Sequence, residues 1–243
     1  MMNRENQDDL QHVDSSGTAP RNVWNEQREL CPRTLDYDRP WYVYARQLIV
    51  KVGLNSGQAI DIGCGLGEFM CQLREMGLEV TGLDGNPHQI RQSQQDGLKA
   101  QIADFEDNLP FGDATFDLVT CLEVIEHIAR AENLLKEMAR ILAPGGYIVL
   151  STPNFGCWQN RIRYLLGAGP VNEGVHLRFF TRKRLEQLIT ACGLEITDRA
   201  SFGPITGVNF LCRRFKMKTR NWLVPTQFEG ILAAHLLYAA KKL

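Results

Sequence analysis

Residues 59–69, AIDIGCGLGEF, constrain the fold more than any other stretch, because a short apolar strand runs through a glycine-rich turn into a helix. Gly63, Gly65 and Gly67 permit a tight turn in which a ligand lies against bare backbone and faces a helix N-terminus. A nicotinamide or flavin loop, G-x-G-x-x-G, would need glycine where the chain has Glu68. An acidic side chain there would also repel a pyrophosphate. The pattern indicates an open α/β sheet whose ligand is not a dinucleotide.

Strand and helix patterns alternate around this loop. Apolar strand patterns cover residues 59–62, 78–84, 98–104, 116–124, 147–153 and 235–242, and LEITDRASF (194–202) follows the last helix. Helical patterns cover residues 37–53, 68–77, 87–97, 132–142 and 181–193, and they end at glycine or at Pro144-Gly145-Gly146. This order predicts an α/β fold with a doubly wound, mostly parallel sheet.

The chain is expected to hold one large domain with an N-terminal extension. Residues 1–22 are predicted to be a disordered tail, residues 23–56 an N-terminal helical cap, and residues 57–243 the α/β domain. Two aromatic and basic insertions, 154–180 and 203–230, interrupt the alternation and are expected to cover the carboxyl edge of the sheet, where ligands bind. The first could form a lid over the ligand or pack as an ordinary loop and helix.

Composition narrows the partners and the compartment. Lys and Arg (27) nearly balance Asp and Glu (28), so no global field attracts nucleic acid, and a nucleic-acid partner is not expected. The longest apolar stretch, ILAAHLLYAA, is about half of a bilayer span, and the seven cysteines contain no C-x-x-C pair, as is typical of reduced thiols. We expect a cytoplasmic protein without a transmembrane segment. The basic and aromatic segment 208–224 could grip an anionic group or a membrane surface, or form a solvated helix face.

The run Asp61-Ile-Gly63-Cys-Gly65-Leu-Gly67 resembles the first motif of class I S-adenosylmethionine-dependent methyltransferases, and the resemblance extends over residues 59–242. It implies a Rossmann-like methyltransferase fold with a seven-stranded sheet and S-adenosylmethionine as cofactor. In this family an acid after the second strand accepts the ribose hydroxyls, and an acid and an apolar residue after the third bind adenine. The resemblance implies a donor site formed by Asp61, Gly63, Cys64, Gly65, Gly67, Asp84, Gly85, Asp104, Phe105 and Leu122.

The run LEVIEHI is open to three interpretations of its polar residues, Glu123, Glu126 and His127. The acids can end a strand and favour the start of a helix through its dipole. His127 can act as a general base on a substrate hydroxyl, with Glu126 positioning it, because imidazole titrates near neutral pH. The three groups can instead bind a divalent cation, although a nitrogen ligand fits Mg²⁺ imperfectly.

Two further resemblances bear on this cluster. FDLVTCLEVIEHI is similar to the O-methyltransferases of ubiquinone biosynthesis and to small-RNA 3′-terminal 2′-O-methyltransferases, in which E-x-x-E-H is associated with a metal. The second likeness implies His176 as a fourth ligand, yet the chain lacks the further histidine of the RNA enzymes. STPNFGCWQNRIRYLLG is similar to methyltransferase-like proteins of bacterial methionine biosynthesis, which lack E-x-x-E-H.

The expected activity is methyl transfer from S-adenosylmethionine to a hydroxyl oxygen of a small or lipid-linked metabolite, with Mg²⁺ not favoured as a cofactor. Because the sulfonium already carries an activated methyl group, the enzyme mainly has to align a nucleophile. Two alternatives stay open. One is an RNA 2′-O-methyltransferase, and the other is a regulatory or partner protein that binds the donor without turnover.

Overall fold

The computed structural model describes residues 39–169, 176–203 and 222–243. Its centre is one sheet in the order β3-β2-β1-β4-β5-β9-β7-β8, and β6 also pairs with β9. β1 to β5 are parallel, whereas β9 is antiparallel to β5 and β6. The strands are β1 (Gln58–Ile62), β2 (Glu79–Asp84), β3 (Ala100–Ile102), β4 (Phe116–Leu122), β5 (Leu142–Pro153), β6 (Leu194–Arg199), β7 (Phe202–Gly203), β8 (Trp222–Leu223) and β9 (His235–Lys242).

The predicted doubly wound, mostly parallel sheet is confirmed, with residues 235–242 as its last strand. Beyond the expected seven strands, β7 and β8 add a short antiparallel ribbon of two residues each. The parallel strands bring their carboxyl ends to one edge, so the residues that follow β1, β2 and β4 meet there.

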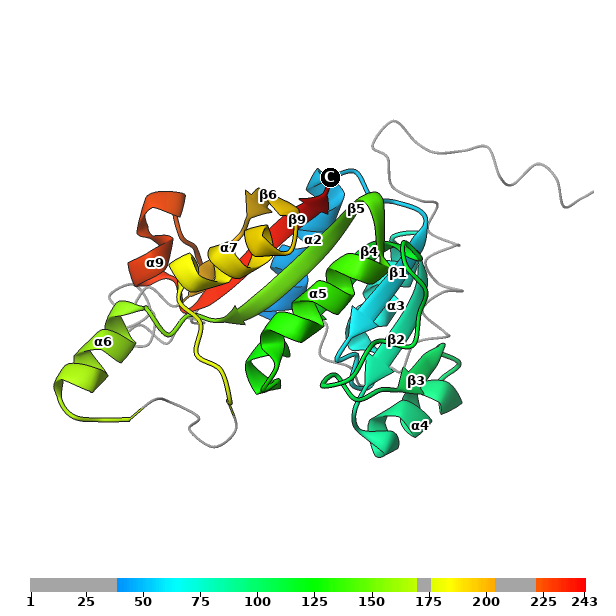
Figure 1. The fold of residues 1–243 in the computed structure, drawn as a ribbon, viewed down its shortest axis with the longest axis horizontal. Helices are drawn as coiled ribbons and strands as arrows, with labels where there is room; N and C mark the ends of the chain where they lie inside the picture. The colour runs from blue at the N-terminus through cyan, green and yellow to red at the C-terminus, as the bar shows by residue number, and fades with distance from the viewer. Residues whose placement is uncertain (1–38, 170–175, 204–221) are drawn as a thin grey trace, which may run out of the picture.

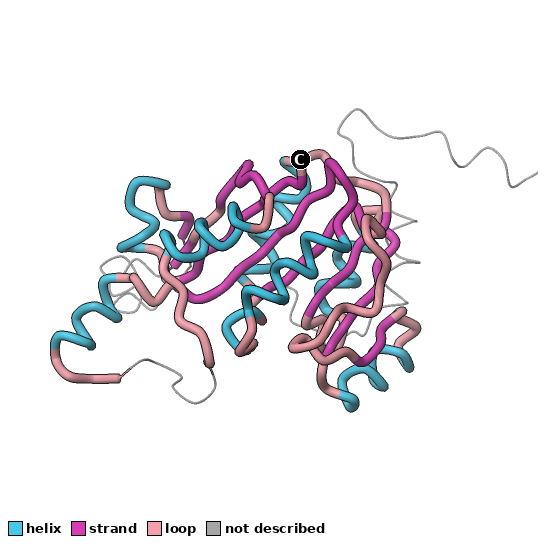
Figure 2. Tube along the Cα trace, viewed as in Figure 1, coloured by secondary structure: helices cyan, strands magenta, loops and turns pink. Residues whose placement is uncertain are grey.

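Helices cover both faces of the sheet (Figures 1 and 2). Each layer has its own apolar core, because successive strand residues point to opposite faces: Val119 and Cys121 of β4 face one core, and Leu118 and Leu122 face the other. The helices of the first core are α5 (Ala131–Ile141) and α7 (Arg182–Ala191), and those of the second are α2 (Pro40–Lys51), α3 (Glu68–Glu75) and α4 (Pro87–Gln95).

Element boundaries differ from the sequence-based expectation at two places. β4 ends at Leu122, and a short 3-10 turn, η1 (Ile125–His127), follows it. β5 begins at Leu142, directly after α5. Its pairing with β4 shifts register: Phe116 lies opposite Leu142, but Leu118 lies opposite Tyr147. Pro144 therefore sits in a strand irregularity, where a residue without an N–H donor is tolerated.

The first insertion stands at the carboxyl edge but projects from the molecule. Its helix, α6 (Trp158–Leu165), follows β5 and has no buried residue (Figure 1). The described part of the second insertion ends in η2 (Thr226–Phe228) and α9 (Glu229–Leu232). The tail at 1–22 and most of the basic segment 208–224 lie outside the described residues.

Two expectations drawn from composition can be compared with the structure. Within the described ranges, no helix combines the length and the apolar character that a bilayer crossing requires. Cys64, Cys121, Cys157 and Cys192 are free thiols, whereas Cys71 is disulfide-bonded. The prediction of reduced thiols throughout the chain is therefore wrong at Cys71.

Candidate active site

The glycine loop joins β1 to α3 at the carboxyl edge of the sheet. Gly63, Gly65 and Gly67 have φ values of 77°, 56° and 88°, the left-handed region that favours glycine. A Cβ on Gly63 would stand 2.2 Å from Cγ2 of Val124, so the loop packs tightly against the chain that follows β4. A Cβ on Gly65 would meet nothing within 4 Å. The loop thus offers bare backbone to a ligand on the side of Gly65.

Asp84, at the end of β2, holds this loop from the neighbouring strand. Its Oδ2 accepts a hydrogen bond from the N–H of Gly65 at 2.9 Å, and its Oδ1 accepts one from the N–H of Asn86 at 2.8 Å. A carboxylate has about four acceptor positions, so lone pairs remain for further donors. Asp84 can therefore accept from the hydroxyls of a diol while it fixes the loop.

Asp61 lies below the loop, near the end of β1, and is buried. Its Oδ1 accepts a hydrogen bond from Oγ1 of Thr120 at 2.6 Å. Burial raises the pKa of Asp61 to about 7, although the hydrogen bond from Thr120 opposes the shift. The carboxyl group therefore gains or loses its proton near neutral pH, and a cationic ligand group beside it would favour the charged form.

A cavity of about 510 Å³ lies beside the glycine loop. Such a volume suits a small-molecule or cofactor site. The predicted site residues that line it are Gly63, Cys64, Gly65, Asp84, Phe105, Leu122, Glu123 and His127. The predicted residues outside its lining are Asp61, Gly67, Gly85, Asp104, Glu126 and His176. Among these, Gly67 is the N-cap of α3, and Asp104 accepts a hydrogen bond from the N–H of Glu106 at 2.9 Å.

α2 also lines this cavity, through Arg39, Trp41 and Tyr42, which sequence reasoning missed. The Tyr42 hydroxyl donates to Oε2 of Glu68 at 3.2 Å, and Nη2 of Arg39 lies 3.2 Å from the same oxygen. The Tyr42 ring stacks on Phe69, with 5.1 Å between the ring centroids. The only sequence signal was an aromatic run before the first strand, and no fixed spacing relates such a run to a glycine loop.

Glu123 follows β4 with a φ of 59°, a conformation that is uncommon for a residue with a side chain. Its N–H donates to the carbonyl oxygen and to Oγ of Ser151, both at 3.1 Å. The Ser151 hydroxyl donates back to Oε1 of Glu123 at 2.8 Å, and Nδ1 of His235 lies 2.9 Å from Oε2. Ser151 and His235, neither of which was predicted, thus hold a carboxylate on the cavity wall.

Glu126, three residues further along the chain, lies behind this wall. Its side chain is 1% exposed, and Oε2 accepts a hydrogen bond from Oγ1 of Thr152 at 3.0 Å. Burial, followed by the charge of Glu123, raises the pKa of Glu126 to about 8. Oε1 lies 3.9 Å from Nε2 of His127. The two acids of E-x-x-E-H therefore occupy different environments: Glu123 lines the cavity, whereas Glu126 is buried behind it.

His127 and His176 face each other beside η1, with ring centroids 4.8 Å apart in an edge-to-face arrangement. The N–H groups of Leu177 and Arg178 donate to the Glu126 carbonyl at 2.8 and 2.9 Å, which fixes this segment against η1. Nδ1 of His176 is buried without a hydrogen-bond partner among the described residues, and burial lowers the pKa of His176. One ligand atom from each of Glu126, His127 and His176 lies within 4.8 Å of the others, so these residues could hold a metal ion.

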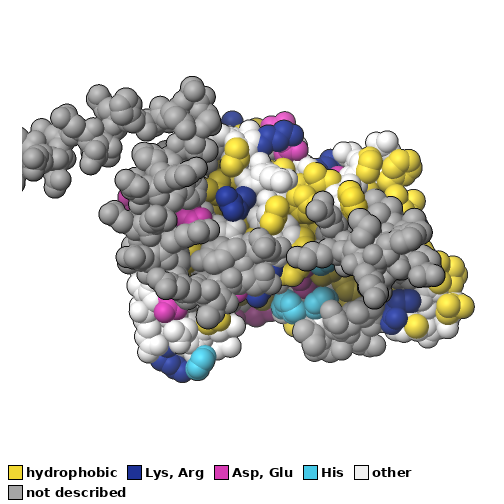
Figure 3. Space-filling model, turned by 180° about the vertical axis from the view of Figure 1, so that it is seen from behind, with side chains coloured by type: hydrophobic (Ala, Val, Ile, Leu, Met, Phe, Trp, Pro, Cys, Tyr) yellow, Lys and Arg dark blue, Asp and Glu magenta, His cyan; other side chains and the backbone are white. Residues whose placement is uncertain are grey.

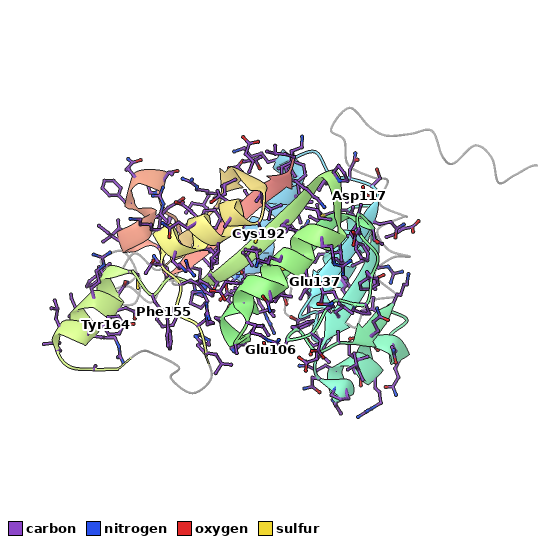
Figure 4. The ribbon with its side chains drawn as sticks, viewed as in Figure 1. Glu106, Asp117, Glu137, Phe155, Tyr164 and Cys192 are labelled. Atoms are coloured by element: carbon purple, nitrogen blue, oxygen red, sulfur yellow. The ribbon has the colours of Figure 1, made fainter. Side chains whose placement is uncertain are left out.

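Other surfaces of the described residues can be compared with this site. Figure 3 shows histidine and acidic side chains gathered on the face opposite to that of Figure 1. A larger cavity, of about 680 Å³, lies between Glu106 and Glu137, far from Tyr164 of α6 (Figure 4). Two of its charged groups pair with each other, since Nε of Arg130 donates to Oε2 of Glu106 at 3.2 Å. Tyr164 lines neither of these two cavities, and the lid considered from the sequence stays a prediction.

Comparison with known proteins agrees with this geometry. Residues 39–199 match a family model described as a methyltransferase domain. The chain is 30% identical over 171 residues to a ubiquinone biosynthesis O-methyltransferase of Idiomarina loihiensis, covering 64% of this chain and 69% of the relative. It is 28% identical over 174 residues to the protein of that name from Azoarcus sp., covering 66% and 75%.

Solved structures show the same fold at lower identity. An S-adenosylmethionine-dependent methyltransferase of Thermotoga maritima, described as a possible histamine N-methyltransferase, superposes with a TM-score of 0.60 and 20% identity over 92% of this chain and 95% of its own. A second such methyltransferase, from Mesorhizobium loti, gives a TM-score of 0.61 and 18% identity over 84% and 99%.

The residues beside the glycine loop fit S-adenosylmethionine. This molecule offers a diol and an ammonium group and carries no phosphate, which suits a cavity with Asp84 on its wall, Asp61 below it and Glu68 at the first turn of α3. When bound, the donor supplies an activated methyl group. Sequence, fold and cavity thus agree, and the chain belongs to the methyltransferase domain family as an S-adenosylmethionine-dependent methyltransferase.

Proposed function

We propose that the protein methylates a hydroxyl oxygen of a small metabolite bound at the carboxyl end of β4. The observation that carries this proposal is that Glu123 and His127 line the same cavity as the glycine loop. An acceptor beside these side chains would share one cavity with the methyl donor. The relatives named as O-methyltransferases of ubiquinone biosynthesis support oxygen as the acceptor atom and an acceptor related to quinones.

The proposed reaction needs a base near the acceptor. As the new C–O bond forms, the C–S bond of the donor breaks and its electron pair remains on sulfur, so the hydroxyl proton must move to another group. His127 is the candidate, because its side chain is 39% exposed and lines the cavity. Glu126, 3.9 Å from Nε2 of His127, would position the imidazole. Aligning donor and acceptor supplies much of the remaining rate enhancement.

The surface beside β5 supports an acceptor with a lipid tail. Ile162, Leu165 and Leu166 of the α6 region are exposed, and Arg161 and Arg163 flank Ile162 in sequence. Apolar and basic groups together suit the anionic interface of a membrane. We therefore extend the proposal to a lipid-linked acceptor. A cytoplasmic enzyme would reach it by binding to the membrane surface.

A divalent cation at Glu126, His127 and His176 is a second candidate for part of the site. The buried Nδ1 of His176, which lacks a hydrogen-bond partner among the described residues, favours this reading. Two imidazoles and one carboxylate suit a transition metal better than Mg²⁺. Such an ion would compete with the proposed base, because a metal-bound imidazole nitrogen cannot accept a proton.

The test combines donor binding with an acceptor panel. Calorimetric titration should show that S-adenosylmethionine binds, and S-adenosylhomocysteine should accumulate with phenols, catechols and their prenylated forms. Formation of product with an RNA 3′ end or with histamine, and with no hydroxylated metabolite, would contradict the proposal. Donor binding without any turnover across the panel would favour a regulatory protein instead.

A further inference from the structure

We propose that His235 is a positioning residue for the acceptor: together with Ser151 it holds the Glu123 carboxylate on the cavity wall, where that carboxylate accepts a hydrogen bond from a hydroxyl group of the acceptor adjacent to the one that is methylated. The inference rests on the proposed function, because it assigns a residue contact to the acceptor of that reaction. It separates two tasks within E-x-x-E-H. Glu123 orients the acceptor through the adjacent hydroxyl group, and His127 removes the proton of the hydroxyl group that is methylated.

The first support is a closed set of hydrogen bonds between Glu123 and Ser151. The Glu123 N–H donates to Oγ of Ser151 at 3.1 Å, and the same hydroxyl donates to Oε1 of Glu123 at 2.8 Å. Ser151 is fully buried in β5, so its hydroxyl cannot turn toward solvent. The Ser151 oxygen accepts from the backbone N–H of Glu123, so the Ser151 hydroxyl proton points to the Glu123 side chain. One carboxylate oxygen therefore has a fixed position.

The second support is the way in which the His235 ring is held. Its plane lies 7° from that of Phe202, with 5.1 Å between the ring centroids, and the Trp41 ring lies 5.9 Å away. His235 begins β9, where it pairs with Pro153 of β5 and with Phe202 of β7. Packing and strand register therefore both fix the nitrogen that lies 2.9 Å from Oε2 of Glu123.

The third support is backbone strain at the same residue. Among the described residues other than glycine, only Ala114 and Glu123 have a positive φ. Strained positions persist where the surroundings determine them, and they gather at functional sites. Here the strain turns the chain between β4 and η1 so that the Glu123 side chain reaches a cavity that the glycine loop also lines.

The chemistry follows from this arrangement. A carboxylate that accepts from Ser151 and His235 stays in a fixed orientation and keeps lone pairs for a third donor. A hydroxyl group that donates to it fixes the direction in which the adjacent, reacting hydroxyl group presents its lone pairs. Fixing that direction favours in-line approach to an electrophilic methyl group, and small errors in alignment reduce the rate strongly.

A purely structural role for the pair would consist of joining the ends of β4, β5 and β9. Two substitutions distinguish this role from positioning. His235→Phe keeps an aromatic ring between Phe202 and Trp41 but removes the hydrogen-bond donor. His235→Asn loses the ring but places an amide N–H near the position of Nδ1.

The experiment measures kcat and KM of the full chain with 3,4-dihydroxybenzoate as the acceptor probe, together with calorimetric Kd values for S-adenosylmethionine. We expect His235→Phe to lower kcat by about 10- to 100-fold, with the donor Kd within about twofold of wild type. His235→Asn should recover most of that loss. Unchanged kcat in His235→Phe, or an equal loss in both variants, would overturn the proposal.

A double-substitution cycle covers the possibility that His235→Phe impairs folding. Glu123→Gln alone and Glu123→Gln with His235→Phe should show the same kcat, because His235 acts only through Glu123. Additive losses would overturn the proposal. If the wild type does not methylate the probe, the proposed function fails for this acceptor class. The role of the Glu123–His235 pair is then tested by measuring the affinity for 3,4-dihydroxybenzoate in the presence of S-adenosylhomocysteine. His235→Phe must weaken this binding.

Discussion

The two halves of the cavity are built in different ways. The proposed donor half centres on bare backbone, on Asp84 and on Asp61 below the loop, which all lie between β1 and the end of β2. The acceptor half gathers side chains from the end of β4, from β5 and from β9. On the proposed assignment, local sequence specifies much of the donor side, whereas long-range strand order specifies the acceptor side. Either half can therefore be altered while the other is retained.

The largest effect is expected in the acceptor half, at His127. His127→Asn should lower kcat by about 10²- to 10⁴-fold, the usual contribution of a general base, and leave the donor Kd unchanged. Steady-state kinetics at saturating donor and a calorimetric titration measure the two quantities separately. A variant that loses donor affinity as much as turnover would show that the halves are not independent.

Asp84 tests the donor half. Asp84→Ala removes both the anchor of Gly65 and the proposed acceptor for the ribose hydroxyls, so the donor Kd should rise by about 10- to 100-fold. Asp107→Ala is the matched control, because Asp107 is a mostly exposed acid that lies 4.0 Å from Arg130. If the control weakens donor binding equally, the effect reflects total charge and not this contact.

The raised pKa of Asp61 predicts that donor binding depends on pH. With its pKa raised to about 7, the buried carboxyl is increasingly protonated below neutral pH and loses its attraction for the donor's ammonium group. The donor Kd should therefore rise by up to about tenfold for each pH unit below pH 7, since one proton is linked to binding. Asp61→Asn should bind weakly at every pH. A flat profile in the wild type would contradict a role for Asp61 in donor binding.

The smallest effect is expected at Glu126. Its pKa in the folded protein, about 8, exceeds the ordinary 4.5, so its contribution to stability is complete below about pH 4.5 and is lost as pH rises through 8. The neutral amide in Glu126→Gln resembles the protonated acid. The variant should keep most of its turnover at pH 7. Its melting temperature, relative to that of the wild type, should increase from pH 5 to pH 8.

The same residue tests the cation. A bound ion would keep Glu126 charged, so Glu126→Gln would then abolish turnover, and the result would contradict the protonated form. Dialysis against a chelator should leave wild-type turnover largely intact. A loss that a divalent cation restores in the wild type, and fails to restore in Glu126→Gln, would establish the metal centre at Glu126, His127 and His176.

The sequence predicted the sheet because each strand carried its own apolar pattern and each helix its own period. It also brought Gly63, Gly65 and Asp84 to one cavity, since strand ends of a parallel sheet meet at one edge. It could not show that His235 contacts Glu123, because no local pattern encodes how β9 enters beside β5. The left-handed turn at Glu123 was hidden too, since a residue other than glycine gives no sign of positive φ.

Glu68 gives the donor cavity a preference among the molecules of a cell. Its buried carboxylate stands at the first turn of α3 and is held by Tyr42 and Arg39. Many abundant nucleotides carry phosphates, which a nearby negative charge repels. Arg39 also lines the cavity, but its guanidinium is engaged by Glu68, so a phosphate entering there would have to displace this ion pair. We therefore expect ATP and nicotinamide nucleotides to compete poorly with a sulfonium donor even at much higher concentration.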